Sequence, residues 1–328
     1  MNELVKIDSL IRFEDALNRM ILQFIQSQDV SESSRRTYQR AIRAFVKWII
    51  SEGKRNPTRE DVLLYKTFLE NKGLSPLTRS TYLTVVRKFF AWTEEKRFYP
   101  NIAKGIKTGK RVKGFRKDPL SLEQLKELLT SIDRSTAIGL RDFALLNTLM
   151  RTALRTIEIV RADVGDIRQE SGEPVLWIRG KGHESKDDFV VLTESTLKPI
   201  LEYLQTRGNV KDDEPLFVSL SDRNQNGRLT TRSISRIVKN HLKRIGLNSK
   251  RLTAHSLRHG GLTALLSHGN GNIQEAQILG RHADINVTQI YLHNIERVKN
   301  APEKKLGKAI DDVLGNGKSV EDKAQGGL

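Results

Sequence analysis

A basic segment that contains no acidic residue divides this chain of 328 residues into two parts. Residues 104–117 include seven Lys or Arg residues and three Gly residues. Low hydrophobicity and charge of a single sign argue against a packed element there. Each flanking part is long enough to bury its own core. The sequence therefore predicts two domains, at 1–103 and 119–296, joined by a basic linker at 104–118.

The chain carries a net charge of +17 at pH 7. This excess favours a polyanionic partner, most simply nucleic acid, because neutralised phosphates release counterions. The alternative is a basic protein with no such partner. The fourteen residues 104–117 would reach at most about 45–50 Å when extended, which is enough to pass round a duplex. The alternative for this segment is a solvated spacer.

The composition excludes several classes of site. The chain has no Cys, which excludes disulfides, thiolate zinc sites and cysteine nucleophiles and is typical of a cytoplasmic protein. No apolar run approaches the roughly 20 residues of a membrane span, and the N-terminus lacks the layout of a secretory signal. With the positive charge, this predicts a cytoplasmic, nucleoid-associated protein.

The first domain is predicted to be helical over about 12–100, and two of its segments repeat one pattern. Tyr38 and Tyr82 are each followed by Arg, Phe and Trp at offsets of 5, 7 and 10. Offsets of 7 and 10 return near one side of a helix, so we expect Phe and Trp in the core and basic neighbours on another face, where they could meet phosphates. The candidate DNA-binding residues, with those of the linker, are Arg35, Arg36, Arg40, Arg43, Arg79, Arg87, Lys88, Lys107, Lys110, Arg111 and Lys113.

The second domain is predicted to be mainly helical with a small antiparallel sheet. A strand pattern occurs near 164–167, and apolar runs at 175–178 and 189–192 predict a hairpin around a Gly-Lys-Gly turn. The end of the chain, from Gly315, is Gly-rich and polar and is predicted to be disordered. The fold class is therefore α+β, mainly α. Helical patterns cover roughly 121–131, 138–152, 193–206, 230–246, 255–268, 272–280 and 285–292.

Four residues near the end of the second domain could act together in chemistry. His255 and Arg258 are three residues apart, which places them on one face of a helix. His282 and Tyr291 follow within about forty residues. The set offers an acid/base group, a cation for an oxyanion, a second donor and a nucleophile, as attack on a phosphodiester without a metal requires. A Tyr in a helical pattern is, in isolation, more often a core residue.

Four separated segments resemble, in order and spacing, the motifs of tyrosine site-specific recombinases of the phage-integrase family. Residues 152–159 resemble the segment of the first catalytic arginine, and 180–182 resemble the catalytic-lysine loop. Residues 255–259 match the His-x-x-Arg box, and 282–293 match the closing His and Tyr box. The helices at 12–100 look like the family's SAM-like core-binding domain. The chain is identified as a member of this family, nearest in layout to the Xer-like two-domain type.

The resemblance implies a role for each residue of the site. Tyr291 would attack the scissile phosphate, forming a 3′-phosphotyrosine link and freeing a 5′-hydroxyl. Arg155 and Arg258 would hold the non-bridging oxygens. His255 would be the general acid/base, and His282 would donate to the phosphate or position it.

Other residues around this set have supporting roles or open ones. Lys181 would protonate the departing 5′ oxygen, and Lys186 in the same loop is its rival. An exposed hairpin lysine is the ordinary alternative for both. Glu158 is expected to support Arg155, with which it could form an ion pair at i,i+3. His259 is expected to support its neighbours rather than to react.

Two features depart from the family's usual pattern. The family shows Leu-Gly-His before the final interval, whereas residues 279–282 here read Leu-Gly-Arg-His. We align on the nine residues that separate His282 from Tyr291, which leaves the role of Arg281 open. Only about eleven residues precede the first expected helix, which argues against an additional N-terminal domain for distant arm sites.

The resemblance implies a recombinase that closes round duplex DNA at inverted-repeat core sites, without metal, ATP or other cofactor. Strand exchange implies a tetramer on DNA, and an accessory directionality factor could act with it. The C-terminal segment 297–328 would provide protomer docking through 297–314, followed by a disordered tail; a terminal helix packing on its own domain is the alternative. Integration and excision of a mobile element and chromosome-dimer resolution are both open. The alternatives are a type IB topoisomerase-like enzyme and a non-catalytic DNA-binding protein on the same fold.

Overall fold

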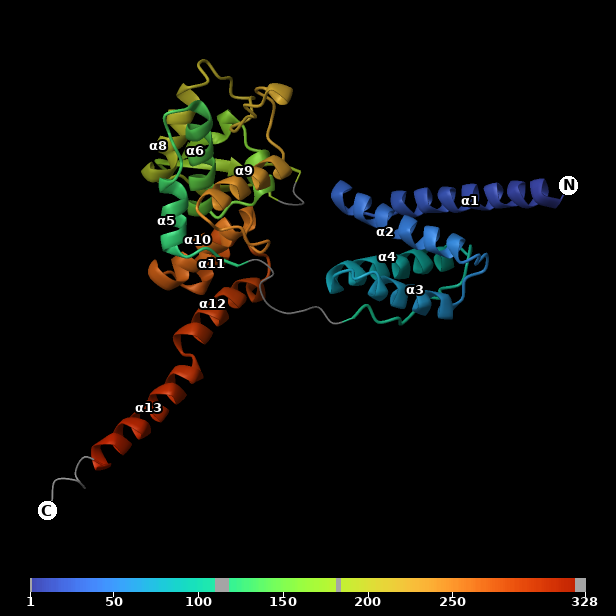
Figure 1. The fold of residues 1–328 in the computed structure, drawn as a ribbon. Helices are drawn as coiled ribbons and strands as arrows, with labels where there is room; N and C mark the ends of the chain where they lie inside the picture. The colour runs from blue at the N-terminus through green and yellow to red at the C-terminus, as the bar shows by residue number, and fades with distance from the viewer. Residues whose placement is uncertain (1, 110–117, 181–183, 322–328) are drawn as a thin grey trace. The chain divides into compact units, whose positions relative to one another are not determined.

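The computed structural model describes residues 2–109, 118–180 and 184–321. The chain divides into two compact units, Met1–Lys113 and Gly114–Leu328, and each is described by itself (Figure 1). None of the helices in these ranges is long and apolar enough to cross a bilayer.

The first unit consists of four helices whose N-termini are marked in the sequence. The side chains of Ser31 and Ser75 accept backbone N–H bonds at the starts of their helices, and Thr58 forms a capping box with Asp61. The first helix begins near the start of the chain and not near residue 12, because no Gly or Pro interrupts the sequence before its end. The helices are α1 (Asn2–Gln26), α2 (Glu32–Ser51), α3 (Arg59–Asn71) and α4 (Pro76–Glu95).

Aromatic side chains fill the core of the first unit. Phe45 and Trp48 of α2 and Phe89 and Trp92 of α4 are all buried, so the structural interpretation of the repeated pattern is confirmed. Phe45 packs edge-on against Phe90 at a ring separation of 5.8 Å, an arrangement that aromatic quadrupoles favour. Ile106, within the segment expected to be a linker, is also buried in this core.

The second unit is built mainly from helices, as expected. The structure contains one short helix, α7, that was not expected, because its 5 residues are too few to show a hydrophobic periodicity. It also continues the last helix to Glu321, whereas disorder was expected from Gly315; residues 322–328 lie outside the described part. The helices are α5 (Leu122–Thr130), α6 (Ala137–Arg151), α7 (Thr156–Val160), α8 (Glu194–Gln205), α9 (Thr231–Arg244), α10 (Ala254–His268), α11 (Ile273–Gly280), α12 (Ile285–Lys299) and α13 (Pro302–Glu321).

A three-stranded antiparallel sheet, β1 (Ile167–Glu170), β2 (Glu173–Ile178) and β3 (Asp188–Val191), accompanies these helices. The expected hairpin is confirmed, with Val175 opposite Val191. The strand expected near 164–167 starts only at its last residue, because Val164–Asp166 forms a 3₁₀ turn. The mainly helical α+β class is thereby confirmed.

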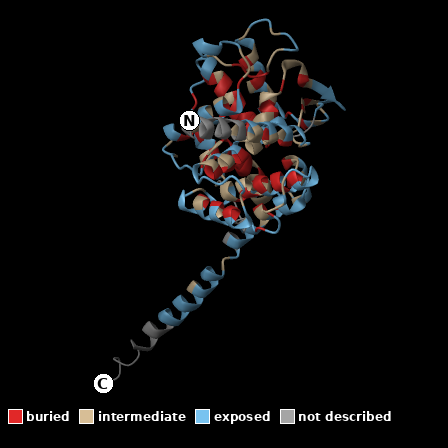
Figure 2. Ribbon diagram, turned by 90° about the vertical axis from the view of Figure 1, so that its right-hand side faces the viewer, coloured by how far each residue is buried: buried red, intermediate tan, exposed pale blue. Residues whose placement is uncertain are grey.

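The core of the second unit forms where α6 and α10 cross. Leu145, Leu146 and Leu149 of α6 and Leu257 of α10 are at most 1 % exposed. Figure 2 shows that α13, by contrast, is largely exposed. The close packing of α10 brings its polar residues into the interior of the unit.

Candidate active site

Two adjacent glycines allow α10 to pack closely against its neighbours. A Cβ at Gly261 would collide with the carbonyl oxygen of Met150 at the end of α6, and one at Gly260 would lie 2.9 Å from that of Leu120. Since these positions lack a side chain, the helix approaches both segments directly. Arg258, one turn before, is consequently only 2 % exposed.

The guanidinium of Arg258 joins three segments that are distant in the sequence. Its two terminal nitrogens donate to the carbonyl oxygens of Ala153 and Gly280. It also lies 3.0 Å from Nε2 of His282. Ala153 has a left-handed backbone (φ 49°), which a non-glycine residue adopts only when its surroundings require it. Burial and the charge of Arg155 lower the pKa of Arg258, but this pKa stays far above neutrality and the group remains cationic.

Arg155 is the N-cap residue of α7 and pairs with the buried carboxylate of Glu158. Nη1 donates to Oε1 of Glu158 at 2.7 Å, and the backbone N–H of Arg155 donates to Oε2 at 2.7 Å. Nη2 donates to the carbonyl oxygens of Arg281 at 2.9 Å and Gly280 at 3.3 Å. The i,i+3 pair expected from the sequence is therefore present, and it lies beside Arg258.

His282 lies in the loop between α11 and α12, and its contacts fix its tautomer. A guanidinium can only donate, so Nε2 of His282 accepts from Arg258. Nδ1 then carries the proton and donates to Oγ1 of Thr288 at 2.9 Å. Burial and the nearby charges of Arg258 and Arg155 lower the pKa of His282 to about 4, so the ring is neutral at pH 7.

Tyr291 extends from α12 into the same site and is only 2 % exposed. Its hydroxyl forms a hydrogen bond with Nδ1 of His259, and its ring lies 6.1 Å from that of His282. Burial raises the pKa of Tyr291 to about 12, although the charges of Arg258 and Arg155 oppose this. In this arrangement the phenol is neutral and withheld from solvent.

His259 is the partner of Tyr291, a contact that the sequence did not reveal. Burial, followed by the proximity of His255 and Arg258, lowers the pKa of His259 to about 3. Its neutral ring can therefore accept the phenolic proton in a hydrogen bond. His255 is solvent-exposed one turn before it, 4.5 Å away between ring centroids; partial desolvation and the charge of Arg258 lower its pKa. The i,i+4 spacing of His255 and His259 was the feature of the sequence that could have placed His259 in the site.

The two lysine candidates of the hairpin differ in what the structure describes. Lys181 lies outside the described residues. Lys186 is held by two carboxylates, with Nζ 2.7 Å from Oδ2 of Asp163 and 2.5 Å from Oδ2 of Asp166. Burial opposes the charge of Lys186, but these two contacts outweigh it and raise its pKa.

The basic residues of the first unit lie on helix surfaces. Arg35, Arg36, Arg40 and Arg43 of α2 and Arg87 and Lys88 of α4 are exposed, and Arg79 is half-buried. Arg36 pairs with Glu32 at 3.2 Å, and Arg79 with Glu70 at 3.2 Å. Lys88 lies 5.2 Å from the ring centroid of Tyr38, so the basic stretches of α2 and α4 adjoin. Lys107 is exposed, whereas Lys110, Arg111 and Lys113 lie outside the described residues.

The neutral histidines predict that stability falls in mild acid. The pKa values of His259 (about 3) and His282 (about 4) in the folded protein lie below the value near 6.5 of an unfolded histidine. At a pH between the folded and the unfolded value, the unfolded state therefore binds more protons than the folded state. Their contribution is full above pH 6.5 and decreases as the pH falls. His259 should contribute a loss of roughly 2 kcal/mol in the free energy of unfolding between pH 7 and pH 5, and His282 a smaller loss, because it is less buried and solvent screens its surroundings. Urea unfolding of the full chain at the two pH values measures this loss.

The matched variants for this measurement are His259→Phe and His268→Gln. His259→Phe keeps a buried ring without a titratable group and should remove part of the pH dependence. His268 is exposed on α10, so His268→Gln should leave the pH dependence unchanged. Equal losses in His259→Phe and the wild type would contradict the assignment.

Comparison with known proteins gives two family matches. Residues 119–297 match the phage integrase family, and residues 21–97 match the SAM-like N-terminal domain of phage integrases. A tyrosine recombinase of Synechococcus elongatus is 30% identical over 284 residues, covering 83% of this chain and 88% of the relative. The tyrosine recombinase XerD of Listeria monocytogenes serotype 4b is 30% identical over 291 residues, covering 85% of this chain and 93% of the relative.

Solved structures share the fold at lower sequence identity. The recombinase XerH, in a post-cleavage complex with a palindromic difH substrate, matches with a TM-score of 0.65 and 23% identity over 82% of this chain and 80% of its own. A lambda integrase dimer bound to a COC′ core site matches with a TM-score of 0.64 and 13% identity over 84% of this chain and 76% of its own. These likenesses concern the fold.

Proposed function

Because this chain belongs to the phage integrase family of tyrosine recombinases, we propose that it cuts and rejoins duplex DNA with Tyr291 as the nucleophile. One observation carries this proposal. Arg155, Arg258, His282 and Tyr291 come from four separate segments and meet around the carbonyl oxygens of residues 153 and 280. Two guanidinium groups, an imidazole and a phenol are the groups that metal-free attack on a phosphodiester uses.

The proposed reaction exchanges one phosphodiester bond for another. The phenolic oxygen of Tyr291 forms a bond to phosphorus, and the bond from phosphorus to the 5′ oxygen breaks. The 3′ end is then linked to Tyr291, and the departing 5′ oxygen takes up a proton to become a free 5′-hydroxyl. Attack by a 5′-hydroxyl of a second strand reverses these steps and rejoins the DNA. Since bond energy is retained in the phosphotyrosine, the reaction needs no ATP.

The two arginines would bind the non-bridging oxygens of the scissile phosphate. In the described arrangement, Arg155 and Arg258 donate to backbone carbonyl oxygens of the loops that precede α7 and follow α11. DNA would replace some of these acceptors with charged phosphate oxygens, which form stronger hydrogen bonds. The guanidinium groups are therefore already gathered where the negative charge would develop.

Proton transfer would involve three groups. Tyr291 must leave its bond with His259 and lose its proton, and the exposed His255 is the proposed acid/base group. We propose Lys181 as the acid for the 5′ oxygen. The rival Lys186 is engaged by Asp163 and Asp166, and their contacts hold its proton firmly.

The first unit and the basic segment after it would provide most of the contacts with the DNA backbone. The exposed basic residues of α2 and α4 adjoin and could face phosphates together. Lys107 and the basic residues that follow it would continue this contact as a linker, so that the two units could close round one duplex. Inverted-repeat core sites would place two such protomers on each duplex.

A pool of labelled, nicked duplexes with randomised arm sequences tests the proposed function. A nick beside the cleavage position releases the short strand that bears the 5′-hydroxyl, so the covalent product accumulates. Wild-type protein should yield adducts that survive denaturation, attached to a 3′ phosphate, and sequencing them identifies the target. Absence of adduct would contradict the proposal. Adduct without exchange between two recovered sites would favour the topoisomerase-like alternative.

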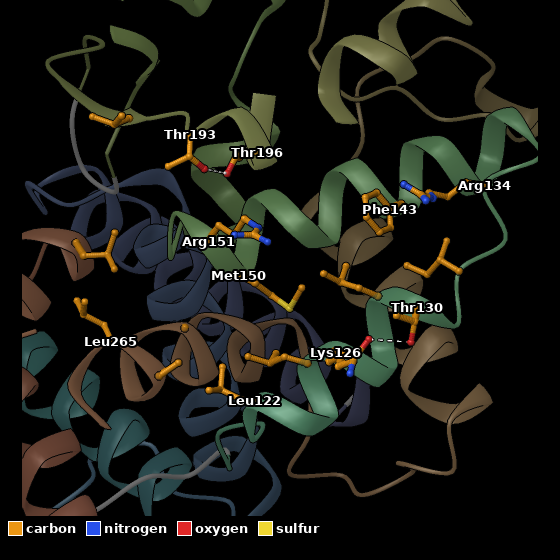
Figure 3. A pocket seen from close by; sticks show the side chains of 17 residues that line it. Leu122, Lys126, Thr130, Arg134, Phe143, Met150, Arg151, Thr193, Thr196 and Leu265 are labelled. Atoms are coloured by element: carbon orange, nitrogen blue, oxygen red, sulfur yellow. Dashed lines mark hydrogen bonds between the residues drawn. The ribbon is translucent and has the colours of Figure 1, made fainter. Parts of the chain in front are cut away.

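We further propose that α13 docks on a second copy of the chain. Leu306, Ile310, Val313 and Leu314 lie at helical spacing on α13 and are between 48% and 72% exposed. An apolar pocket of about 870 Å³ in the second unit could accept this face; Leu122, Phe143 and Met150 are among its lining residues (Figure 3). Lys126, Arg134 and Arg151 also line it and would complement Asp311, which borders the apolar face of α13. Tetramer assembly on DNA would use this contact.

Charge placed on the apolar face of α13 should weaken this assembly. Ile310→Glu is expected to weaken protomer association on DNA at least about tenfold, because a buried carboxylate is costly. Adduct formation on a single site should persist. Lys308→Gln, on the opposite face, changes the net charge equally and should retain assembly. Sedimentation of the protein–DNA complexes measures both, and an unchanged tetramer in Ile310→Glu would contradict docking.

A further inference from the structure

The residue that departs from the family's usual motif, Arg281, occupies a left-handed position at the end of α11. Its backbone angles are φ 47° and ψ 53°, and its N–H donates to the carbonyl oxygen of Ile278 at 2.9 Å. The N–H of His282 donates to that of Gln277 at 3.1 Å. The helix thus ends in a Schellman-like turn that accommodates the additional residue and leaves His282 beside Arg258.

The side chain of Arg281 points into the protein rather than towards solvent. It is 11% exposed, and Nη2 donates to Oε2 of Glu158 at 3.1 Å and to the carbonyl oxygen of Ala153 at 2.9 Å. Its Nε is buried without a hydrogen-bond partner in the described part of the chain. Burying a guanidinium in this way is costly unless the site gains from its charge.

Glu158 is shared between two arginines, and this sharing changes the charge of the site. Arg155 contacts Oε1 of Glu158, and Arg281 contacts Oε2. With Arg258, the three guanidinium groups and one carboxylate leave two net positive charges. Without Arg281, Glu158 would neutralise Arg155 and only one net positive charge would remain. A pentacovalent phosphate carries about two negative charges, which the two net positive charges of the site with Arg281 match.

We propose that Arg281 is a positioning residue that balances the charge of Glu158 and thereby leaves Arg155 fully cationic towards the scissile phosphate. This inference rests on the proposed cleavage of DNA. Arg281 also joins the loop before α7 to the loop after α11, because its side chain binds Ala153 while its own carbonyl accepts from Arg155. It therefore acts through Glu158 and Arg155 and not by contact with DNA.

The ionisation of Glu158 agrees with this role. The side chain is 0% exposed, and burial alone would raise its pKa. The charge of Arg281 and the hydrogen bonds from Arg155 outweigh the burial, so the pKa of Glu158 is lowered. Removal of Arg281 would thus leave this buried carboxylate paired with Arg155.

Single-turnover adduct formation, on a duplex recovered from the nicked pool, tests this inference. Arg281→Met should slow the reaction roughly 30-fold, while Arg281→Lys, which keeps the charge, should remain within about fivefold of the wild type. The affinity for an intact duplex should change less than about threefold, because the charge matters most in the transition state. Every variant keeps a Cβ at the left-handed position, so backbone strain is the same in all of them.

A second substitution distinguishes charge balance from simple structural support. Adding Glu158→Gln to Arg281→Met restores the net charge of the site, so the double variant should react about tenfold faster than Arg281→Met alone. If Arg281 only supported the structure, the double variant would react as slowly as Arg281→Met or more slowly. The matched control is Arg207→Met, since the side chain of Arg207 is only 7% exposed, pairs with Glu214 at 2.8 Å and donates to the carbonyl oxygen of Pro215 at 2.7 Å. It should lower the melting temperature without slowing adduct formation.

The outcomes separate the two proposals. If the wild type forms adduct and Arg281→Met forms it at the same rate, the role of Arg281 is overturned and the proposed function stays intact. A double variant no faster than Arg281→Met would also overturn it. Failure of the wild type to form adduct with any duplex in the pool would overturn both proposals.

Discussion

Replacement of Tyr291 with Phe is expected to abolish covalent attachment to DNA, with a loss of at least about 10⁴-fold in the rate of adduct formation. The phenyl ring keeps the packing of Tyr291 but has no oxygen to form a bond with phosphorus. Stability should change by about 1 kcal/mol, because the hydrogen bond with His259 is removed. Denaturing electrophoresis of the protein with the labelled nicked duplex measures the adduct.

Tyr203→Phe is the matched control for this substitution. Tyr203 is likewise buried in the second unit, and its hydroxyl accepts the backbone N–H of Val218 at 3.2 Å. This variant should lose comparable stability and still form adduct at nearly the wild-type rate. Adduct formation by Tyr291→Phe would show that another residue is the nucleophile.

Substitution of Arg258 should have the second largest effect, on both chemistry and stability. Arg258→Met would remove the cation beside the phosphate and slow adduct formation about 10³-fold. It would also remove the hydrogen bonds through which one guanidinium joins the carbonyl oxygens of Ala153 and Gly280, at a cost of roughly 2–4 kcal/mol, although Arg281 and Arg155 still donate to these two oxygens. Arg258→Lys keeps the charge but not the planar pair of donors, so it should be intermediate in rate.

Arg141→Met separates the loss of chemistry from the loss of stability. Arg141 is 7% exposed, pairs with Asp142 at 2.7 Å and donates to the carbonyl oxygen of Val218 at 3.3 Å, away from Tyr291. It should destabilise the protein to a similar extent and leave the rate of adduct formation within a few fold of the wild type. If Arg258→Met reacted as fast as Arg141→Met at a temperature where both are folded, the proposed role of Arg258 would be wrong.

The described part of the site brings together Arg155, Arg258, His282 and Tyr291 but does not arrange them for attack. Tyr291 is bonded to His259, and Arg155 and Arg258 donate to backbone carbonyls. We expect DNA to draw the guanidinium groups onto phosphate and to free the phenol from His259. In the proposed reaction, the neutral ring of His259 would hold Tyr291 until that exchange takes place.

Local sequence was sufficient for most of the secondary structure. The hairpin of β2 and β3 and the helix with His255 and Arg258 follow from short-range patterns. Errors arose where short-range signals conflict with the surrounding structure. The polar, Gly-rich stretch from Gly315 suggested disorder, yet α13 continues through it. Val164–Asp166 was expected to begin a strand but forms a 3₁₀ turn, in which the carboxylate of Asp166 accepts the backbone N–H of Asp163.

The sequence by itself determined the family, the basic charge and the residues proposed for catalysis, because these are properties of residue type, order and spacing. Only the tertiary structure decided which groups those residues contact. Lys186 pairs with Asp163, and Arg281 pairs with Glu158, from which it is separated by 123 positions in the sequence. Such contacts depend on how helices pack and where loops turn, and no local pattern encodes them.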